Sequence, residues 1–181
     1  TPIVRYLDVQ VPCIPLPLEP PLRILVVISN PLDHDRLDLE RERRQIEETW
    51  ARQEDVAVDF LQPATILELQ DRLTAAPYHA LHYMGHGGFD QRTGRGVLIF
   101  EDERGLGVPL DGSTLGVLLR DVPTLRLVFL NACETARVTK QEGLDPFAGV
   151  ATAMVMAGIP AVVAMQFPIT DGAAIRFANS L

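Results

Sequence analysis

The stretch YHALHYMGHGG, residues 78–88, is an apolar run that ends in a His-Gly-Gly sequence. A short apolar run bounded by glycines predicts a buried strand, here over residues 78–84, followed by a turn. Runs of the same kind recur along the chain, at residues 22–29, 56–61, 125–132 and 160–167. Helical segments separate these runs, and strands that alternate with helices predict parallel pairing through right-handed crossovers. The fold class that we expect is therefore α/β, a three-layer sandwich with a mostly parallel sheet.

The connecting segments carry helix signals. Residues 35–52 are charged and amphipathic, and a second helix begins at Thr65, with Glu68 at the spacing of a capping box. A third helix begins near Asp111 or Ser113. The remaining predicted elements are a β-hairpin and two helices, at residues 94–108, 146–158 and 171–181. The last helix runs to the end of the sequence, so we expect the C-terminal part of the domain to be missing from this chain.

Prolines are concentrated at the start of the sequence. Because proline fixes φ and donates no main-chain hydrogen bond, residues 1–21 are expected to form an extended lead-in or linker. The alternation in IVRYLDVQV nevertheless allows a short edge strand there. The 181-residue chain is long enough to bury a sizeable core, and we expect one folded domain at residues 22–181.

Charge and composition exclude several function classes. The formal charge of −8 disfavours nucleic acid and anionic membranes, because both attract basic surfaces. No apolar run approaches the roughly 20 residues that cross a bilayer, and no signal peptide is visible. Cys13 and Cys133 lie far apart in different contexts, so a reducing, cytoplasmic setting is expected. The sequence VVISNPLDHD has no GxGxxG and the chain has no Walker lysine, which disfavours a nucleotide cofactor, and no other cofactor is expected.

Two reactive side chains follow predicted strands of the sheet. His86 follows the strand at residues 78–84, and Cys133 follows the strand at residues 125–132. The carboxyl ends of parallel strands meet at one edge of a sheet, so an imidazole and a thiol are expected there together. An imidazole can take the proton of a thiol and later protonate a departing amine, as peptide-bond hydrolysis requires. The N–H groups of Gly87 and Cys133 are then the expected donors to the oxyanion.

Structural interpretations of these residues remain open at this point. The spacing between His86 and Cys133 is close to the roughly 50 residues that separate a caspase-type histidine from its cysteine. Taken alone, however, a cysteine after a strand is more often an inert core residue. A metal site of His79, His82 and His86 is a further alternative. We disfavour it, because a strand does not bring positions three and four apart onto one face as a helix does.

Three stretches resemble motifs of CHAT domains, the caspase-like proteases often found behind tetratricopeptide repeats. ALHYMGHGGF resembles their histidine motif, LVFLNACETA their cysteine motif, and GLDPFAGVATAMVMAGIPAVVAMQFPITD the segment that follows. The resemblance runs from about residue 22 to the end of the chain. It implies a caspase-hemoglobinase fold and a cysteine endopeptidase with His86 as general base, Cys133 as nucleophile and Gly87 as oxyanion donor. It also implies that His82 is structural.

The resemblance implies where substrate specificity is set. The positions two before the cysteine and in the turn after the fifth strand hold Asn131 and Gln166, which carry no charge. They support neither a strict Asp preference nor a strict Arg or Lys preference. Asp90 and Glu134 are further substrate-binding candidates that could change that conclusion. NACET departs from the caspase sequence Gln-Ala-Cys-Arg/Gln/Gly-Gly, and Phe167 stands where the family often has tryptophan.

These features together predict a cysteine endopeptidase with a Cys-His dyad, regulated by other domains or by a partner. The expected partners are a protein or peptide substrate and an N-terminal repeat or sensor domain, or another activator. The polar loop at residues 135–145 follows the nucleophile and could become ordered when an activator packs against it. The alternative is a binding or scaffold module that has the caspase-like fold and no turnover.

Overall fold

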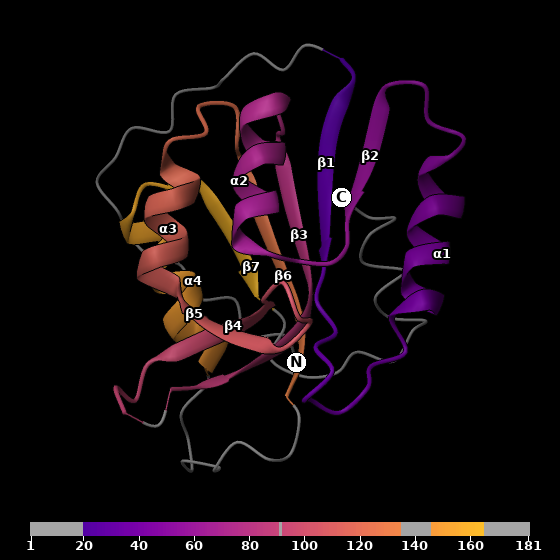
Figure 1. The fold of residues 1–181 in the computed structure, drawn as a ribbon. Coiled ribbons are helices and arrows are strands. Elements are labelled where there is room, and N and C mark those ends of the chain that lie inside the picture. Colours follow the sequence, from indigo (N-terminus) through magenta and orange to yellow (C-terminus); the bar gives the residue numbers. More distant parts are fainter. Residues whose placement is uncertain (1–19, 91, 135–145, 165–181) are drawn as a thin grey trace, which may run out of the picture.

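The computed structural model describes residues 20–90, 92–134 and 146–164 (Figure 1). Within these residues seven strands form one sheet. They are β1 Leu22–Ile28, β2 Val56–Leu61, β3 Ala80–Phe89, β4 Gly96–Glu101, β5 Gly107–Asp111, β6 Leu127–Glu134 and β7 Ala161–Ala164. The strands β2, β1, β3, β6 and β7 pair in parallel in that order, and β4 and β5 add an antiparallel hairpin. The predicted mostly parallel sheet is confirmed.

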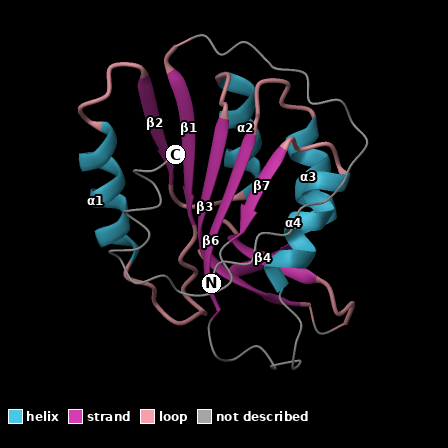
Figure 2. Ribbon diagram, turned by 180° about the vertical axis from the view of Figure 1, so that it is seen from behind, coloured by secondary structure: helices cyan, strands magenta, loops and turns pink. Residues whose placement is uncertain are grey.

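Helices cover both faces of this sheet (Figure 2). They are α1 Leu39–Trp50, α2 Ile66–Ala75, α3 Gly112–Arg120 and α4 Pro146–Met156. Successive side chains of a strand point to opposite faces, so neighbouring residues of β3 enter different cores. Met84 packs with Leu39 of α1 in the smaller apolar cluster, whereas Tyr83 packs in the larger cluster with α2, α3 and α4. The three-layer sandwich is therefore confirmed.

Capping side chains set the starts of α2 and α3. Thr65 Oγ1 accepts a hydrogen bond from the N–H of Glu68 at 3.2 Å. The Asp111 carboxylate accepts from the N–H groups of Ser113 at 2.9 Å and Thr114 at 3.1 Å. These bonds satisfy N–H groups that have no acceptor within the first helical turn. The cap at Thr65 was predicted from the sequence, and of the two candidates for α3 the structure selects Asp111.

The helix α1 begins later than predicted. Residues 29–38, which we call the β1–α1 loop, precede it and include the first part of the predicted helix at residues 35–52. Asn30 Nδ2 donates to the carbonyl oxygen of Leu37 at 3.1 Å, and the N–H of Leu37 donates to Asn30 Oδ1 at 3.1 Å. These two bonds close a loop over residues in which the amphipathic pattern alone predicts the first part of the helix.

Glycines allow α3 and α4 to pack closely. A Cβ on Gly112 would lie 2.7 Å from Val150 Cα and 2.8 Å from Val150 O. A Cβ on Gly116 would lie 2.7 Å from Ala157 Cβ. Atoms at such distances overlap, so α3 can approach the main chain of α4 only where it carries no side chain.

The strand β3 differs most from its prediction, because it includes the His-Gly-Gly sequence instead of turning there. Its last residues, Gly87 to Phe89, pair with β4 in the antiparallel direction. This pairing supplies hydrogen-bond partners that keep the glycines extended. The predicted hairpin at residues 94–108 is confirmed as β4 and β5.

Several predicted features lie outside the described residues. These are most of the proline-rich lead-in, the loop after the cysteine and the last helix, at residues 1–19, 135–145 and 171–181. The end of the fifth predicted parallel strand also lies outside the described residues, since β7 is described only to Ala164. Among the described helices, none combines the length and the apolar character needed to cross a membrane.

Candidate active site

The strand β3 changes its neighbour just before His86. Along one edge it pairs with β1 as far as Ile28 and Met84, and from Gly87 onward it pairs with β4 (Figure 1). Between these two ladders the N–H of Ser29 donates to Met84 O at 2.9 Å. His86 therefore lies where a parallel neighbour ends and an antiparallel one begins. The carboxyl end of β1 and the loop that follows it lie beside this point, and open α/β sheets bind ligands at the carboxyl ends of their strands.

Along its other edge β3 pairs with β6. The register runs from Ala80 opposite Leu127 to His86 opposite Cys133. Opposed positions of neighbouring strands share a face of the sheet. Positions 86 and 133 are thus adjacent and lie on the face of Met84, which is the face that α1 covers. The prediction that these two strands are neighbours is confirmed.

His86 is fully buried, with 0% of its surface exposed. The β1–α1 loop lies beside it, and the ring of His34 stands 5.2 Å from the His86 ring, centroid to centroid. Burial lowers the pKa of His86, and the neighbouring His34 lowers it further. A hydrogen bond with the Asp35 main chain and the charges of Asp35 and Asp33 act in the opposite direction. Because the lowering prevails, His86 is neutral at pH 7, which is the form that can accept a proton.

A buried tyrosine holds the main chain at His86. Tyr83 Oη donates toward His86 O at 2.8 Å and toward Ile99 O of β4 at 2.6 Å. Ser29 Oγ donates to the same Ile99 oxygen at 2.7 Å. Burial raises the pKa of Tyr83, so the hydroxyl keeps its proton and remains a donor. A Cβ on Gly85 would lie 2.7 Å from Tyr83 Oη and 2.8 Å from Ser29 O, so this arrangement requires glycine there.

Two further histidines, His82 within β3 and His79 just before it, lie closer to the start of the strand than His86 does. The ring of His82 packs edge-on against Phe129, with 4.8 Å between centroids. Burial lowers the pKa of His82 to about 4, and its Nε2 has no hydrogen-bond partner among the described residues. His79, before the start of β3, accepts a hydrogen bond from the N–H of Arg23 at 3.0 Å. In the described part of the chain, no group of three or more His, Cys, Asp or Glu side chains could hold a metal ion.

The proposed specificity positions have different surroundings. Asn131 Nδ2 donates to Glu42 Oε2 of α1 at 2.9 Å, so an acidic side chain accompanies this uncharged position. Glu134 ends β6 opposite Gly87, which is itself buried within β3. Gln166 lies outside the described residues.

Asp90 belongs to the turn between β3 and β4. Its Oδ1 accepts from the N–H of Arg92 at 2.9 Å, and its Oδ2 accepts from Thr93 Oγ1 at 2.7 Å. The hydrogen bond from Thr93 is the main reason that the pKa of Asp90 is lowered. Both carboxylate oxygens therefore have turn partners, and the structure gives this side chain a local role.

Sequence reasoning missed His34 and Glu42. His34 lies after β1, at the same edge of the sheet as the end of β3, so the rule about carboxyl ends of strands could have found it. The sequence analysis considered that stretch, VVISNPLDHD, only for the absence of a nucleotide-binding motif. No sequence signal identifies Glu42, because only the packing of α1 over the sheet brings it to Asn131.

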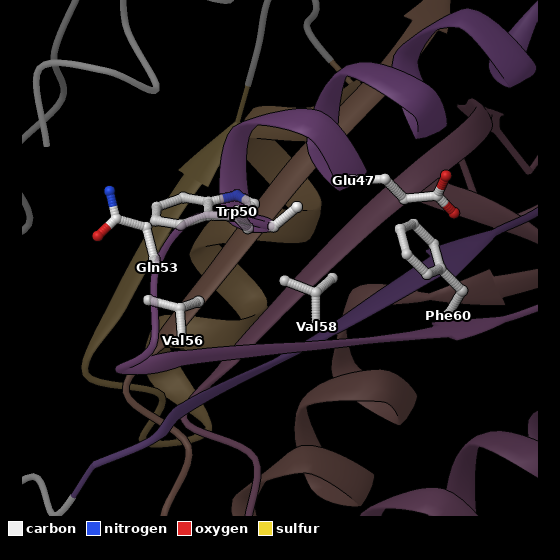
Figure 3. A pocket seen from close by; sticks show the side chains of 7 residues that line it. Glu47, Trp50, Gln53, Val56, Val58 and Phe60 are labelled. Atoms are coloured by element: carbon white, nitrogen blue, oxygen red, sulfur yellow. The ribbon is translucent and has the colours of Figure 1, made fainter.

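A groove lies apart from this site, between the end of α1 and the edge strand β2 (Figure 3). Its lining residues are Glu47, Trp50, Ala51, Gln53, Val56, Val58 and Phe60. Arg43 stands over the Phe60 ring, 4.9 Å from the centroid, and its Nε donates to Glu47 Oε1 at 3.0 Å. Since β1 separates β2 from β3, this groove is distinct from the surroundings of His86.

The fold and the placement of the two motifs define a class of protein. A mostly parallel sheet with helices on both faces, bearing a histidine and a cysteine at opposed positions of two central strands, is a caspase-like α/β architecture. Residues 15–181 match the family model of the CHAT domain, and the chain belongs to this caspase-like family. The family resemblance seen in the sequence is thereby confirmed. No curated protein matches the chain.

Proposed function

We propose that this chain is a cysteine endopeptidase in which Cys133 is the nucleophile and His86 the general base. The observation that supports this most is the register of β3 and β6, which puts position 86 opposite position 133 where β4 replaces β1 as the neighbour of β3. The neutral state of the buried imidazole gives further support, because a base must be unprotonated to act.

The proposed reaction proceeds in two halves. The His86 imidazole takes the thiol proton of Cys133, and the thiolate attacks the carbonyl carbon of the scissile bond. The N–H groups of Gly87 and Cys133 hydrogen-bond the oxyanion, which collapses and expels the amine with the proton from His86. Water, deprotonated by His86, then hydrolyses the thioester and restores the thiol.

The burial of His86 supports regulation of this activity. With 0% of its surface exposed, the base reaches a substrate only after the surrounding segments move. We propose that a partner, such as an N-terminal repeat or sensor domain, moves the segments that cover His86 when it binds. A reducing compartment such as the cytoplasm would keep Cys133 as a thiol.

The same burial favours a second candidate function, a binding module that retains the caspase-like fold without turnover. An imidazole that stays enclosed can serve packing, whereas it cannot act on a substrate. The two candidates differ in whether Cys133 becomes reactive under any condition.

The test is labelling of the full-length protein with peptide acyloxymethyl ketones that carry acidic, basic or apolar side chains at the P1 position. Wild type is compared with Cys133→Ala and His86→Ala, and Cys13→Ala is the matched control because it removes the other cysteine. Labelling that Cys13→Ala retains and that both other variants lose supports the peptidase. Labelling that survives His86→Ala excludes the dyad, and absence of labelling with every probe and candidate activator favours the binding module.

A further inference from the structure

The loop that contacts His86 is held at several points. The N–H of Asn30 donates to Glu101 Oε1 at 3.0 Å, and the N–H of Leu32 donates to Gly105 O at 2.8 Å. These two contacts attach the β1–α1 loop to the hairpin formed by β4 and β5, and the two bonds between Asn30 and Leu37 close the loop on itself. A loop fixed in this way can hold a side chain in a defined orientation against the end of β3.

Within this loop, His34 is held from two directions. Its Nδ1 lies 3.0 Å from Asp33 Oδ1, and the same oxygen accepts the N–H of Gly107 at 2.8 Å. Gly107 also provides the space for the ring, because a Cβ there would lie 2.8 Å from His34 Nδ1 and closer still to Cε1. The other side of the ring faces His86, at 5.2 Å between centroids and with 40° between the ring planes.

We propose that His34 is a positioning residue for His86: held by Asp33 and by the gap at Gly107, it fixes the orientation of the imidazole that acts as base. The inference rests on the proposed function, since it assigns His34 a role in the same site. Asp33 acts on His86 through His34, and the hairpin supports both.

This role has an electrostatic consequence. When His34 is protonated it disfavours a second positive charge on His86, whereas the Asp33 carboxylate favours one. Asp35 in the loop and Tyr83 in β3 also lie near His86. Tyr83 carries no charge at neutral pH because burial raises its pKa. Loss of His34 and loss of the Asp33 charge should therefore move the titration of His86 in opposite directions.

The experiment follows the imidazole signals of His86 by NMR across the pH range, in the full chain carrying Cys133→Ala so that turnover plays no part. His34→Phe, which retains a ring, should move the midpoint of the His86 titration upward, and Asp33→Asn should move it downward. Gly107→Ala displaces His34 without removing it and should also move the midpoint upward. His79→Phe is the matched control, since His79 lies at the opposite end of β3, and it should leave the midpoint unchanged.

A second measurement separates positioning from charge. In protein with Cys133 intact, His34→Ala should slow labelling by the best acyloxymethyl ketone about tenfold or more, while His34→Phe retains most of the rate above its shifted midpoint. A His86 midpoint that is the same in wild type, His34→Phe and Asp33→Asn would overturn the inference, whatever the labelling shows. Labelling that is independent of His86 would instead overturn the proposed function, so the two failures are distinguishable.

Discussion

Replacement of Tyr83 by phenylalanine removes one oxygen atom from the wall of the candidate site. The Tyr83 hydroxyl lies 2.8 Å from His86 O and 2.6 Å from Ile99 O, and both Tyr83 and His86 are fully buried. In the variant Ile99 O keeps the hydrogen bond from Ser29 Oγ, whereas His86 O loses the hydroxyl. Removing one partner of a buried hydrogen bond costs about 1–3 kcal/mol. We therefore expect the free energy of unfolding to fall by about 2 kcal/mol.

Tyr78 provides a matched comparison. Its ring is also buried, with 2% of the residue exposed, and its Oη donates to Asp59 Oδ2 at 2.9 Å. The Asp59 side chain is 39% exposed, so water can replace the lost donor. Tyr78→Phe should cost under about 1 kcal/mol, although it removes the same atom from an equally buried ring.

Urea unfolding of both variants, followed by the fluorescence of Trp50, measures the two free energies of unfolding, because Trp50 is the only tryptophan of the chain. The m-values should match that of wild type if only the native contact has changed. A loss in Tyr83→Phe that is no larger than the loss in Tyr78→Phe would refute the reasoning. The labelling rate of Cys133 provides a second reading, and Tyr83→Phe should lower it because the main chain at His86 is less firmly held.

Three further predictions concern acidity, helix packing and capping. Since the pKa of His82 is about 4 in the folded protein and about 6.5 in an unfolded chain, wild type should lose up to about 3 kcal/mol as pH falls from 6.5 to 4. Urea titrations should show a shallower loss for His82→Phe, and equal slopes would contradict the assignment. Gly112→Ala should lower the free energy of unfolding by about 1–3 kcal/mol, because its Cβ would overlap with Val150. Gly149→Ala should raise it by about 0.5–1 kcal/mol, because the Cβ would find no atom nearer than 3.9 Å. Both changes should appear as shifts of the urea midpoint. Asp111→Ala should cost about 1 kcal/mol at pH 7, and because the pKa of Asp111 is lowered in the folded state, thermal melts should show the difference shrinking as pH falls through that pKa.

Much of the fold follows from local sequence. Continuous apolar runs predicted the parallel strands, because strands buried on both faces show no alternation of polar residues. Thr65 and Asp111 identified their helix starts, since a side-chain oxygen there satisfies N–H groups of the first turn. The rule that parallel strands end at one edge of the sheet predicted that positions 86 and 133 lie together, although both lie within β3 and β6 and not past the strand ends, where they were predicted.

The features that the sequence did not reveal depend on contacts between distant segments. Glycines have no side-chain pattern, so GHGG did not indicate that β3 continues through this sequence and pairs there with β4. The segment around His34 is polar, and its place beside His86 results from the bonds that tie Asn30 and Leu32 to the hairpin. Glu42 reaches Asn131 only because α1 crosses the sheet at that point. Tertiary pairing, which local propensity does not contain, decided each of these cases.

The change of neighbour along β3 also constrains how the chain is made. The surroundings of His86 come from β1 and its loop, the β4–β5 hairpin and β6, and the last residue of this set to be synthesised is Glu134. When only β1 to β5 have left the ribosome, the nascent chain contains the proposed base His86 but lacks β6, which carries the proposed nucleophile. The proposed dyad therefore cannot form on a partly made chain until β6 has emerged and paired with β3. A peptidase of the proposed kind, built in this order, would have no activity toward neighbouring nascent chains before β6 has been synthesised.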